Sequence, residues 1–269
     1  DGGKPGRRMS LFTFSGAAGF ASGPLIAVGA IALLGERGLA WLMLPALLLT
    51  PVFWRNLPPD PSPTPEGDPV PGAAEVGRLL LGPLGLVFAI SALSSFVQRA
   101  FLTFMPMVSA GDGRSEAVGA MILTVYMVAQ AFGSLTGGLL TDRVDRSRLL
   151  AVLTALTVPA HLAAFALPSG STLGLAAAAI GGFLNMAIIP PVVILAQEAM
   201  PSGASIGSGI SMGLAWATGT LMLIPTGFLG DLVGPRAAAL WVIPTLLIGT
   251  ALALHPSLRP QRPIRASAG

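Results

Sequence analysis

Long apolar runs divide the sequence, and this division restricts the possible folds more than any other feature. Each run approaches or exceeds the roughly 20 residues that a helix needs to cross the hydrocarbon core of a bilayer. Charged residues are only 10% of the chain, against about 25% in soluble domains, which is too few to cover a water-exposed surface. We therefore expect an all-α membrane protein with about eight transmembrane helices. The runs are 9–34, 39–54, 80–107, 118–140, 149–167, 173–196, 207–230 and 237–254.

Basic residues are distributed unevenly between the connections of these runs. If the N-terminal segment is cytoplasmic, the cytoplasmic side carries eleven basic residues and the opposite side carries three. Cytoplasmic loops of membrane proteins are enriched in Lys and Arg in this way. We therefore expect both termini to be cytoplasmic, and because the basic residues do not form one patch, we expect no nucleic-acid partner. The cytoplasmic set is Lys4, Arg7, Arg8, Arg55, Arg78, Arg143, Arg146, Arg148, Arg259, Arg262 and Arg265, and the opposite set is Arg37, Arg114 and Arg236.

A proline-rich segment, 55–78, interrupts the apolar pattern. Such a composition cannot bury a core and favours an extended, polyproline-like linker. We expect a cytoplasmic linker here, with two helices before it in 1–54 and six helices after it in 79–254. A basic cytoplasmic tail is expected over 255–269. The linker prolines are Pro58, Pro59, Pro61, Pro63, Pro65, Pro69 and Pro71.

A weak internal repeat relates the two ends of the chain. A Leu-Gly-acid sequence ends both the run 9–34 and the run 207–230, and a Trp followed by a Pro occurs in each of the next runs, 39–54 and 237–254. Duplicated six-helix halves are typical of secondary transporters. We expect the chain to hold the last two helices of an N-terminal half and all six helices of a C-terminal half. Four N-terminal helices of the same protein would then be among its partners.

The most specific motif is the loop Gly138-Leu-Leu-Thr-Asp142-Arg143-Val-Asp145-Arg146-Ser-Arg, after the run 118–140. It resembles the G-x-L-x-D-R-x-G-R loop of the major facilitator superfamily, with Asp145 in place of a glycine. An aspartate and arginines at this place can bind a neighbouring helix terminus in one conformation and release it in another. The resemblance implies a gating loop made by Gly138, Asp142, Arg143 and Arg146. The alternative is a basic loop that only sets the topology.

A second motif lies in the first run, at Gly19, Gly23 and Pro24. It resembles the G-x-x-x-G-P motif on the fifth helix of proton-coupled antiporters in the same superfamily. Small residues four positions apart let two helix backbones approach closely, and a proline kinks the helix beside them. The resemblance favours export over uptake. Ordinary packing of small residues is the alternative.

Over about Ser10 to Trp241, the chain resembles the fosmidomycin-resistance branch of the superfamily. Three stretches carry the resemblance: Ser10-Leu-Phe with the glycines after it, Leu102-Thr-Phe-Met-Pro, and Ala196-Gln-Glu-Ala-Met-Pro. The resemblance implies a drug-resistance exporter of the bacterial inner (cell) membrane, and fosmidomycin is the founding substrate of the branch.

Polar residues within the runs are candidates for the substrate or proton pathway, since their burial in lipid is costly. Arg99, beside Gln98, would meet an anionic substrate if it faces a central cavity, or else would extend to the interface or pair structurally. Tyr126 and Gln130 lie one turn apart on one helix face. Their alternative role is hydrogen bonding between helices.

The later runs add Asn185 and Glu198 to these candidates. Asn185 lies one turn before Pro190-Pro191, where we expect a bent helix, and bent helices often border a transport pathway. Glu198 lies at a cytoplasmic helix end, where it could carry a coupling proton or serve only as a structural helix-end residue. His161, a single histidine within a run, is interpreted as a hydrogen-bonded packing residue.

The sequence therefore predicts a secondary active transporter that exports a small molecule, either anionic or drug-like, in exchange for protons. The substrate would bind near the middle of the bilayer, and alternating access would move it across. The alternative is a non-transporting membrane assembly or sensor subunit. We expect no enzyme, cofactor or metal site, because the sequence contains no nucleophile–base arrangement, metal-ligand cluster or phosphate-binding loop.

Overall fold

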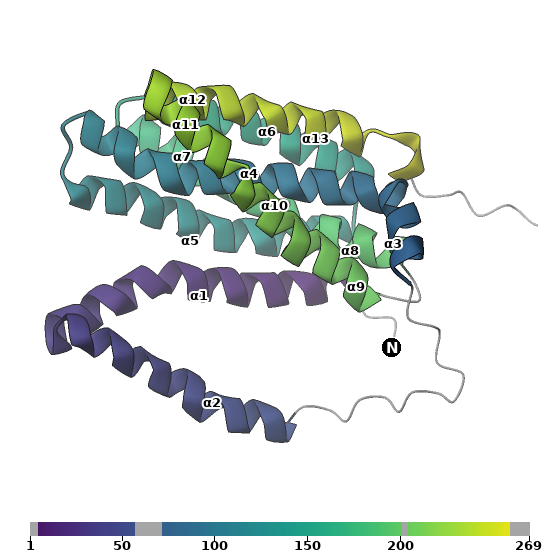
Figure 1. Ribbon diagram of the computed structural model, residues 1–269, viewed down its shortest axis with the longest axis horizontal. Coiled ribbons are helices and arrows are strands. Elements are labelled where there is room, and N and C mark those ends of the chain that lie inside the picture. Colours follow the sequence, from purple (N-terminus) through teal and green to yellow (C-terminus); the bar gives the residue numbers. More distant parts are fainter. Residues whose placement is uncertain (1–4, 57–71, 201–203, 259–269) are drawn as a thin grey trace, which may run out of the picture.

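The computed structural model describes residues 5–56, 72–200 and 204–258, and the regular elements in these ranges are all helical (Figure 1). An all-α fold was expected and is confirmed. The elements are α1 (Pro5–Leu34), η1 (Glu36–Leu42), α2 (Met43–Asn56), α3 (Ala73–Leu80), α4 (Pro83–Gly111), α5 (Glu116–Thr141), α6 (Arg146–Ala166), α7 (Thr172–Ala187), α8 (Ile189–Ala199), α9 (Ala204–Ser208), η3 (Gly209–Leu214, a π-helix), α10 (Ala215–Leu221), α11 (Leu223–Val233), α12 (Pro235–Val242), η4 (Ile243–Thr245), α13 (Leu246–Ala253) and η5 (Pro256–Leu258).

Among the described residues, seven helical segments are long and apolar enough to cross a membrane. They correspond to seven of the eight predicted runs. The remaining run, 9–34, lies within α1, a continuous helix of 30 residues whose side chains are described only in part. The multi-pass helical architecture predicted from the apolar runs is therefore confirmed. The segments are Glu36–Asn56, Pro83–Gly111, Glu116–Thr141, Arg146–Ala166, Thr172–Ala199, Ala204–Val233 and Pro235–Ala253.

The helices from α4 to α13 form one bundle, and α1 lies along α5 at its edge (Figure 1). Glycines permit the closest approach within the bundle, between α5 and α7. A Cβ added at Gly133 would lie 2.0 Å from the carbonyl oxygen of Phe183, and one at Gly137 would lie 2.2 Å from that of Ala187. Only glycine can occupy these two positions without a shift of the backbone.

Four of the seven long segments consist of more than one helical element, and two of these segments line the cavity described below. In the segment Thr172–Ala199, α7 ends at Ala187 and α8 begins at Ile189. The first turn of α8 contains prolines. Proline has no N–H to donate to the preceding turn, and so the bend predicted at Pro190-Pro191 is confirmed. The segment Ala204–Val233 instead contains the π-helix η3, which the sequence did not predict.

The predicted linker 55–78 is shorter in the structure than the sequence indicated. Helix α2 continues to Asn56, and α3 covers Ala73–Leu80, so both ends of the segment are helical. The prolines end at Pro71, and 73–80 contains no proline and is mostly Ala, Glu, Arg and Leu, which are good helix formers. An extended conformation was predicted for the proline-rich part, and residues 57–71 of it lie outside the described residues. Most of the predicted basic tail lies outside them as well.

Helix α2 diverges from the bundle and has no buried residue (Figure 1). Its apolar side chains, such as Leu48, Phe53 and Trp54, are exposed. A helix that is apolar on all sides requires lipid or other helices around it. The structure therefore leaves a large apolar face on α2 and on the outer side of α1.

Candidate functional site

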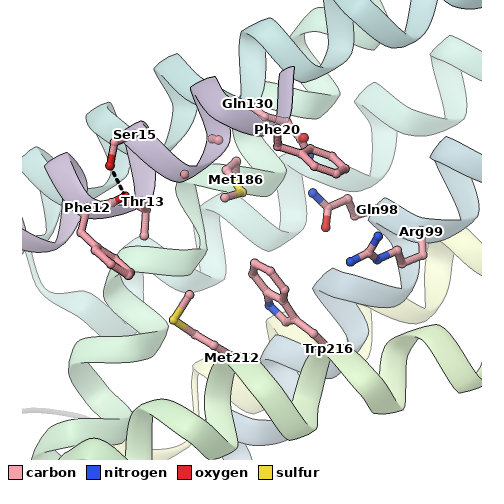
Figure 2. Close-up of a pocket in the computed structure, with 12 residues that line it drawn as sticks. Phe12, Thr13, Ser15, Phe20, Gln98, Arg99, Gln130, Met186, Met212 and Trp216 are labelled. Carbon is pink, nitrogen blue, oxygen red and sulfur yellow. Dashed lines mark hydrogen bonds between the residues drawn. The ribbon is translucent and has the colours of Figure 1, made fainter. Parts of the chain in front are cut away.

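A cavity of about 400 Å³ lies among α1, α4, α5, α7, η3 and α10, near the middle of the long helices (Figure 2). It lies between α1, which packs against α5, and the helices α4, η3 and α10. The lining residues are Phe12, Thr13, Ser15, Gly16, Ala17, Phe20, Gln98, Arg99, Gln130, Met186, Met212 and Trp216.

The arginine and amide side chains of the cavity gather at one side of it. Figure 2 shows Gln98 and Arg99 of α4 at one side, and Phe12 of α1 and Met212 of η3 at the other. The fold thus brings three predicted candidates together at the wall of one cavity. They are Gln98, Arg99 and Gln130. Arg99 faces the cavity and has no carboxylate partner among the described residues, where the ion pairs join other side chains at the two ends of the bundle.

Three side-chain nitrogens at this cavity are buried and have no hydrogen-bond partner within the described part of the chain. They are Nε of Arg99, Nε2 of Gln130 and Nε1 of Trp216. Buried polar groups are nearly always hydrogen-bonded, so an exception needs an explanation. Six such atoms occur in the described part of the chain, and half of them therefore surround one cavity. Trp216 was not among the candidates predicted from the sequence.

Tyr126 does not line the cavity, although Gln130 one turn later does. Its ring stacks on Phe101 with centroids 4.1 Å apart, and its hydroxyl lies 3.1 Å from Nε2 of His161. The other ring nitrogen of His161 lies 2.9 Å from the carbonyl oxygen of Thr157, which can only accept. Nδ1 therefore carries the hydrogen, and Nε2 accepts the hydrogen bond from Tyr126. His161 is fully buried and hydrogen-bonded, as its interpretation as a packing residue required.

Asn185 also points away from the cavity. Its side-chain nitrogen donates to the backbone oxygen of Ser94 at 3.1 Å and to the Ser94 hydroxyl at 3.2 Å. Both residues are buried, and the two bonds join α7 to α4 just before the bend at Pro190. The structure therefore places Asn185 in a contact between helices and not on the cavity wall.

The loop motif contacts the start of α1. One carboxylate oxygen of Asp142 accepts the backbone N–H of Gly6 at 2.8 Å, and the other accepts that of Arg7 at 3.0 Å. The first N–H groups of a helix have no partner within the helix and carry a partial positive charge. Asp142 therefore caps α1 from a distant part of the chain. We name this contact the clasp.

Gly138 permits the close approach that the clasp requires. A Cβ added at Gly138 would lie 2.2 Å from the Cβ of Ser10 and 2.5 Å from the backbone oxygen of Gly6. No real side chain fits at these distances, and so α1 and α5 can meet here only because residue 138 is glycine. The glycine and the aspartate of the motif thus serve the same contact.

The other charges of the loop have separate partners. Arg146 forms an ion pair with Glu198 at the end of α8, which joins two of the predicted candidates. Asp145 caps α6, because its carboxylate accepts the backbone N–H of Arg148 at 2.8 Å. A capping role explains an aspartate where the superfamily loop has glycine. Arg143 is exposed, and no ion pair of it occurs among the described residues.

The two antiporter-like glycines of α1 have no close neighbour in the described part of the chain. A Cβ added at Gly19 or Gly23 would meet nothing within 4 Å, and the side chain of Pro24 is not described. The helix is continuous through all three residues. The close backbone approach that this spacing can support is therefore not formed with any described helix.

A polar cluster at the other end of the bundle was not predicted. Asp112, at the end of α4, accepts hydrogen bonds from Ser169 at 2.6 Å and from Arg236 at 2.7 Å. The Ser169 hydroxyl, assisted by the Arg236 guanidinium, holds the pKa of the Asp112 carboxyl below its ordinary value, although burial acts in the opposite direction. The cluster joins three connections that lie far apart in sequence, which is why no local pattern revealed it.

Comparison with known proteins agrees with this geometry. Residues 2–220 match the Major Facilitator Superfamily, a match that includes the loop motif and every residue of the cavity. One similar protein is the uncharacterized MFS-type transporter YfnC of Bacillus subtilis, which is 30% identical over 124 residues. The matched segment is 45% of this chain and spans only 30% of the length of that protein. On the match over most of its length, the chain belongs to the Major Facilitator Superfamily.

Proposed function

We propose that this chain forms part of a secondary active transporter that exports a small, drug-like molecule in exchange for protons. It would lie in the bacterial inner membrane with both termini in the cytoplasm. Membership of the superfamily and the many apolar helices support a membrane transporter. The uneven distribution of basic residues supports the orientation, because the basic connections are on the clasp side of the bundle.

The clasp between Asp142 and the start of α1 is the observation that supports this function best. It joins the six-helix part to a helix that the repeat assigns to the other half. The two hydrogen bonds end on backbone N–H groups at a helix terminus, and they lie at a partly exposed end of the bundle. When that terminus moves away, water can replace both partners, the carboxylate and the N–H groups. Contacts of this kind are suited to a joint that must open and close.

In the proposed cycle, the cavity lies between two parts that rock against each other. In the described state the clasp closes one end of the boundary between them, which the orientation assigns to the cytoplasmic side. Opening of the clasp would expose the cavity to the cytoplasm and admit the substrate. Re-formation of the clasp would favour release on the other side.

Glu198 is the proposed proton-binding residue of this cycle. Its ion pair with Arg146 connects the end of α8 to the loop that carries Asp142. Protonation of Glu198 would remove its charge and release Arg146, and so a proton would weaken the loop contacts on the cytoplasmic side. Within the described residues, no Asp or Glu lines the central cavity, which makes a carboxylate at the loop the better candidate.

Everted membrane vesicles test the proposal, with radiolabelled fosmidomycin as the probe. We expect energised vesicles that contain the protein to accumulate the probe, and an uncoupler to abolish the accumulation. Glu198→Gln should remove the dependence on the proton gradient. Glu116→Gln, at an exposed residue near the opposite end, is the matched control and should not alter it. Accumulation that continues unchanged with the uncoupler would exclude proton exchange.

The alternative function is a non-transporting membrane assembly or sensor subunit. One observation favours it: α2 has no buried residue and offers its whole apolar surface to other helices. Under this alternative, the vesicles would accumulate no probe, and the protein would copurify in a fixed ratio with another membrane protein. Gradient-driven accumulation by the purified protein in liposomes would reject it.

A further inference from the structure

The strongest unexplained feature of the molecule is the set of unpaired nitrogens around the central cavity. Arg99, Gln130 and Trp216 come from three different helices, and each has a buried nitrogen without a hydrogen-bond partner in the described part of the chain. Gln130 is only 2% exposed. All three residues line the same space, which indicates that a bound molecule satisfies them together.

The chemistry of these groups identifies the polar part of that molecule. Arginine and the tryptophan indole can only donate hydrogen bonds, and the glutamine amide offers donors as well. The molecule must therefore accept hydrogen bonds. Because no Asp or Glu is among the twelve lining residues, the charge of Arg99 is not neutralised by the described cavity wall. An anionic group would satisfy both requirements, since charge-assisted hydrogen bonds are the strong ones.

The remaining lining identifies the apolar part. Phe12, Phe20, Met186 and Met212 line the cavity together with the Trp216 ring. Figure 2 shows Phe12 and Met212 on the side away from Arg99. Aromatic and thioether side chains contact flat rings favourably and adapt to their shape. A volume of about 400 Å³ is near the lower limit for sites that bind drug-sized molecules, and it suits a body of one or two rings.

We propose that the central cavity binds an organic anion that carries an aromatic ring. The acidic group would lie against Arg99, Gln98 and Gln130, and the ring would extend past Trp216 toward Phe12 and Met212. The role of this site as a substrate site rests on the proposed transport function. Binding of the anion itself requires no proton gradient. Cations and uncharged molecules of the same shape should bind more weakly, because they cannot compensate Arg99.

The test uses three probes and the whole chain in lipid nanodiscs, with isothermal titration calorimetry as the measurement. The probes are 2-naphthalenesulfonate, a naphthalene of the same ring system that carries a trimethylammonium group, and inorganic sulfate. We expect the sulfonate to bind at one site, and each of the other probes to bind at least about tenfold more weakly. Equal binding of the cation would overturn the anion assignment. Equal binding of sulfate would overturn the need for a ring.

Variants then localise the site. Arg99→Gln should weaken sulfonate binding by about tenfold or more and remove the preference over the cation. Arg114→Gln removes an exposed arginine outside the cavity and should leave binding unchanged. If Arg99→Gln does not fold, Trp216→Phe keeps the ring and removes only the N–H. Weaker binding is expected for Trp216→Phe and not for its control Trp241→Phe, whose side chain is 69% exposed.

The outcome can be separated from that of the transport proposal. Binding that follows this pattern, together with no gradient-driven accumulation of the same sulfonate in vesicles, would retain the site and reject the exporter. Transport that is insensitive to both Arg99→Gln and Trp216→Phe would reject the site and retain the exporter. Sulfonate binding that neither variant affects would overturn the present inference.

Discussion

Substitution of Asp142 by alanine should open the clasp without unfolding the bundle. The carboxylate accepts two backbone hydrogen bonds at the start of α1, at 2.8 and 3.0 Å. Loss of a capping side chain costs about 0.5–2 kcal/mol in other helices. We expect a value of about 1–2 kcal/mol here, since two bonds are lost at a partly exposed site. That loss corresponds to a shift of about 5- to 30-fold in the ratio of clasped to open molecules.

Spin-label distances can measure this shift, because the chain contains no cysteine that would need to be removed. Labels at Leu11 of α1 and at Leu254 after α13 would occupy exposed positions on α1 and on the far side of the bundle. In nanodiscs, Asp142→Ala should add a population at longer distance. Asp142→Asn should do so only slightly, because asparagine is also a good capping residue.

Asp145→Ala is the matched control for this experiment. It removes the same charge from the same loop, but its cap is on α6 and not on α1. The label distances of this variant should resemble those of the unaltered protein. If Asp142→Ala leaves the distances unchanged, or if Asp145→Ala changes them equally, the loop does not hold α1 through Asp142 and the gating argument is wrong.

Three further predictions concern packing and pH. Gly138→Ala should separate α1 from α5, because its Cβ would lie 2.2 Å from that of Ser10, and the label distances should lengthen as they do for Asp142→Ala. Asn185→Ala should lower the free energy of unfolding by about 1–3 kcal/mol, measured by thermal melting, since it leaves Ser94 without its partner. The contribution of Asp112 to stability should be complete above its ordinary carboxyl pKa of 3.8 and be lost as the pH falls through its lower folded value. The melting difference between the unaltered protein and Asp112→Asn, present near about pH 5, should therefore disappear in stronger acid.

Each of these has its own control. Leu139→Ala, beside Gly138 but exposed, should leave the distances as they were. Thr136→Val changes a hydroxyl that bonds only within its own helix, and a loss of stability equal to that of Asn185→Ala would argue against the contact between helices. Ser169→Ala removes the main cause of the lowered Asp112 pKa and should move the acid transition upward. No movement of the transition would contradict the assigned cause.

Most of the fold could be predicted because its signals are local. A run of apolar residues predicts a membrane helix wherever it packs, and the prolines at 190 and 191 break their helix through a missing N–H that no partner can supply. The resemblance of the loop to the superfamily motif likewise suggested that Asp142 can bind a neighbouring helix terminus. Which terminus Asp142 contacts could not be predicted, because Gly6 and Arg7 lie far from it in the sequence.

The candidate site was predictable only in part. Whether the side chain of a helical residue lines a cavity or contacts another helix depends on how the helices pack around it. Arg99 and Gln130 line the cavity. Tyr126 is on the same helix as Gln130, but it does not line the cavity and is hydrogen-bonded to His161. Asn185 is used in a contact between helices. Trp216 and the π-helix before it carried no polar pattern that would have selected them.

By itself, the sequence determined that this chain spans a membrane many times, where most of its helices begin and end, and which loop carries the motif that resembles the superfamily's. These follow from hydropathy, proline and the order of a few charges, which act within one turn or one segment. Only the tertiary structure decided that the first run lies against that loop and that three unpaired nitrogens surround one apolar cavity. Such contacts depend on residues about a hundred positions apart in the chain. Their geometry is set by helix packing, which no local pattern records.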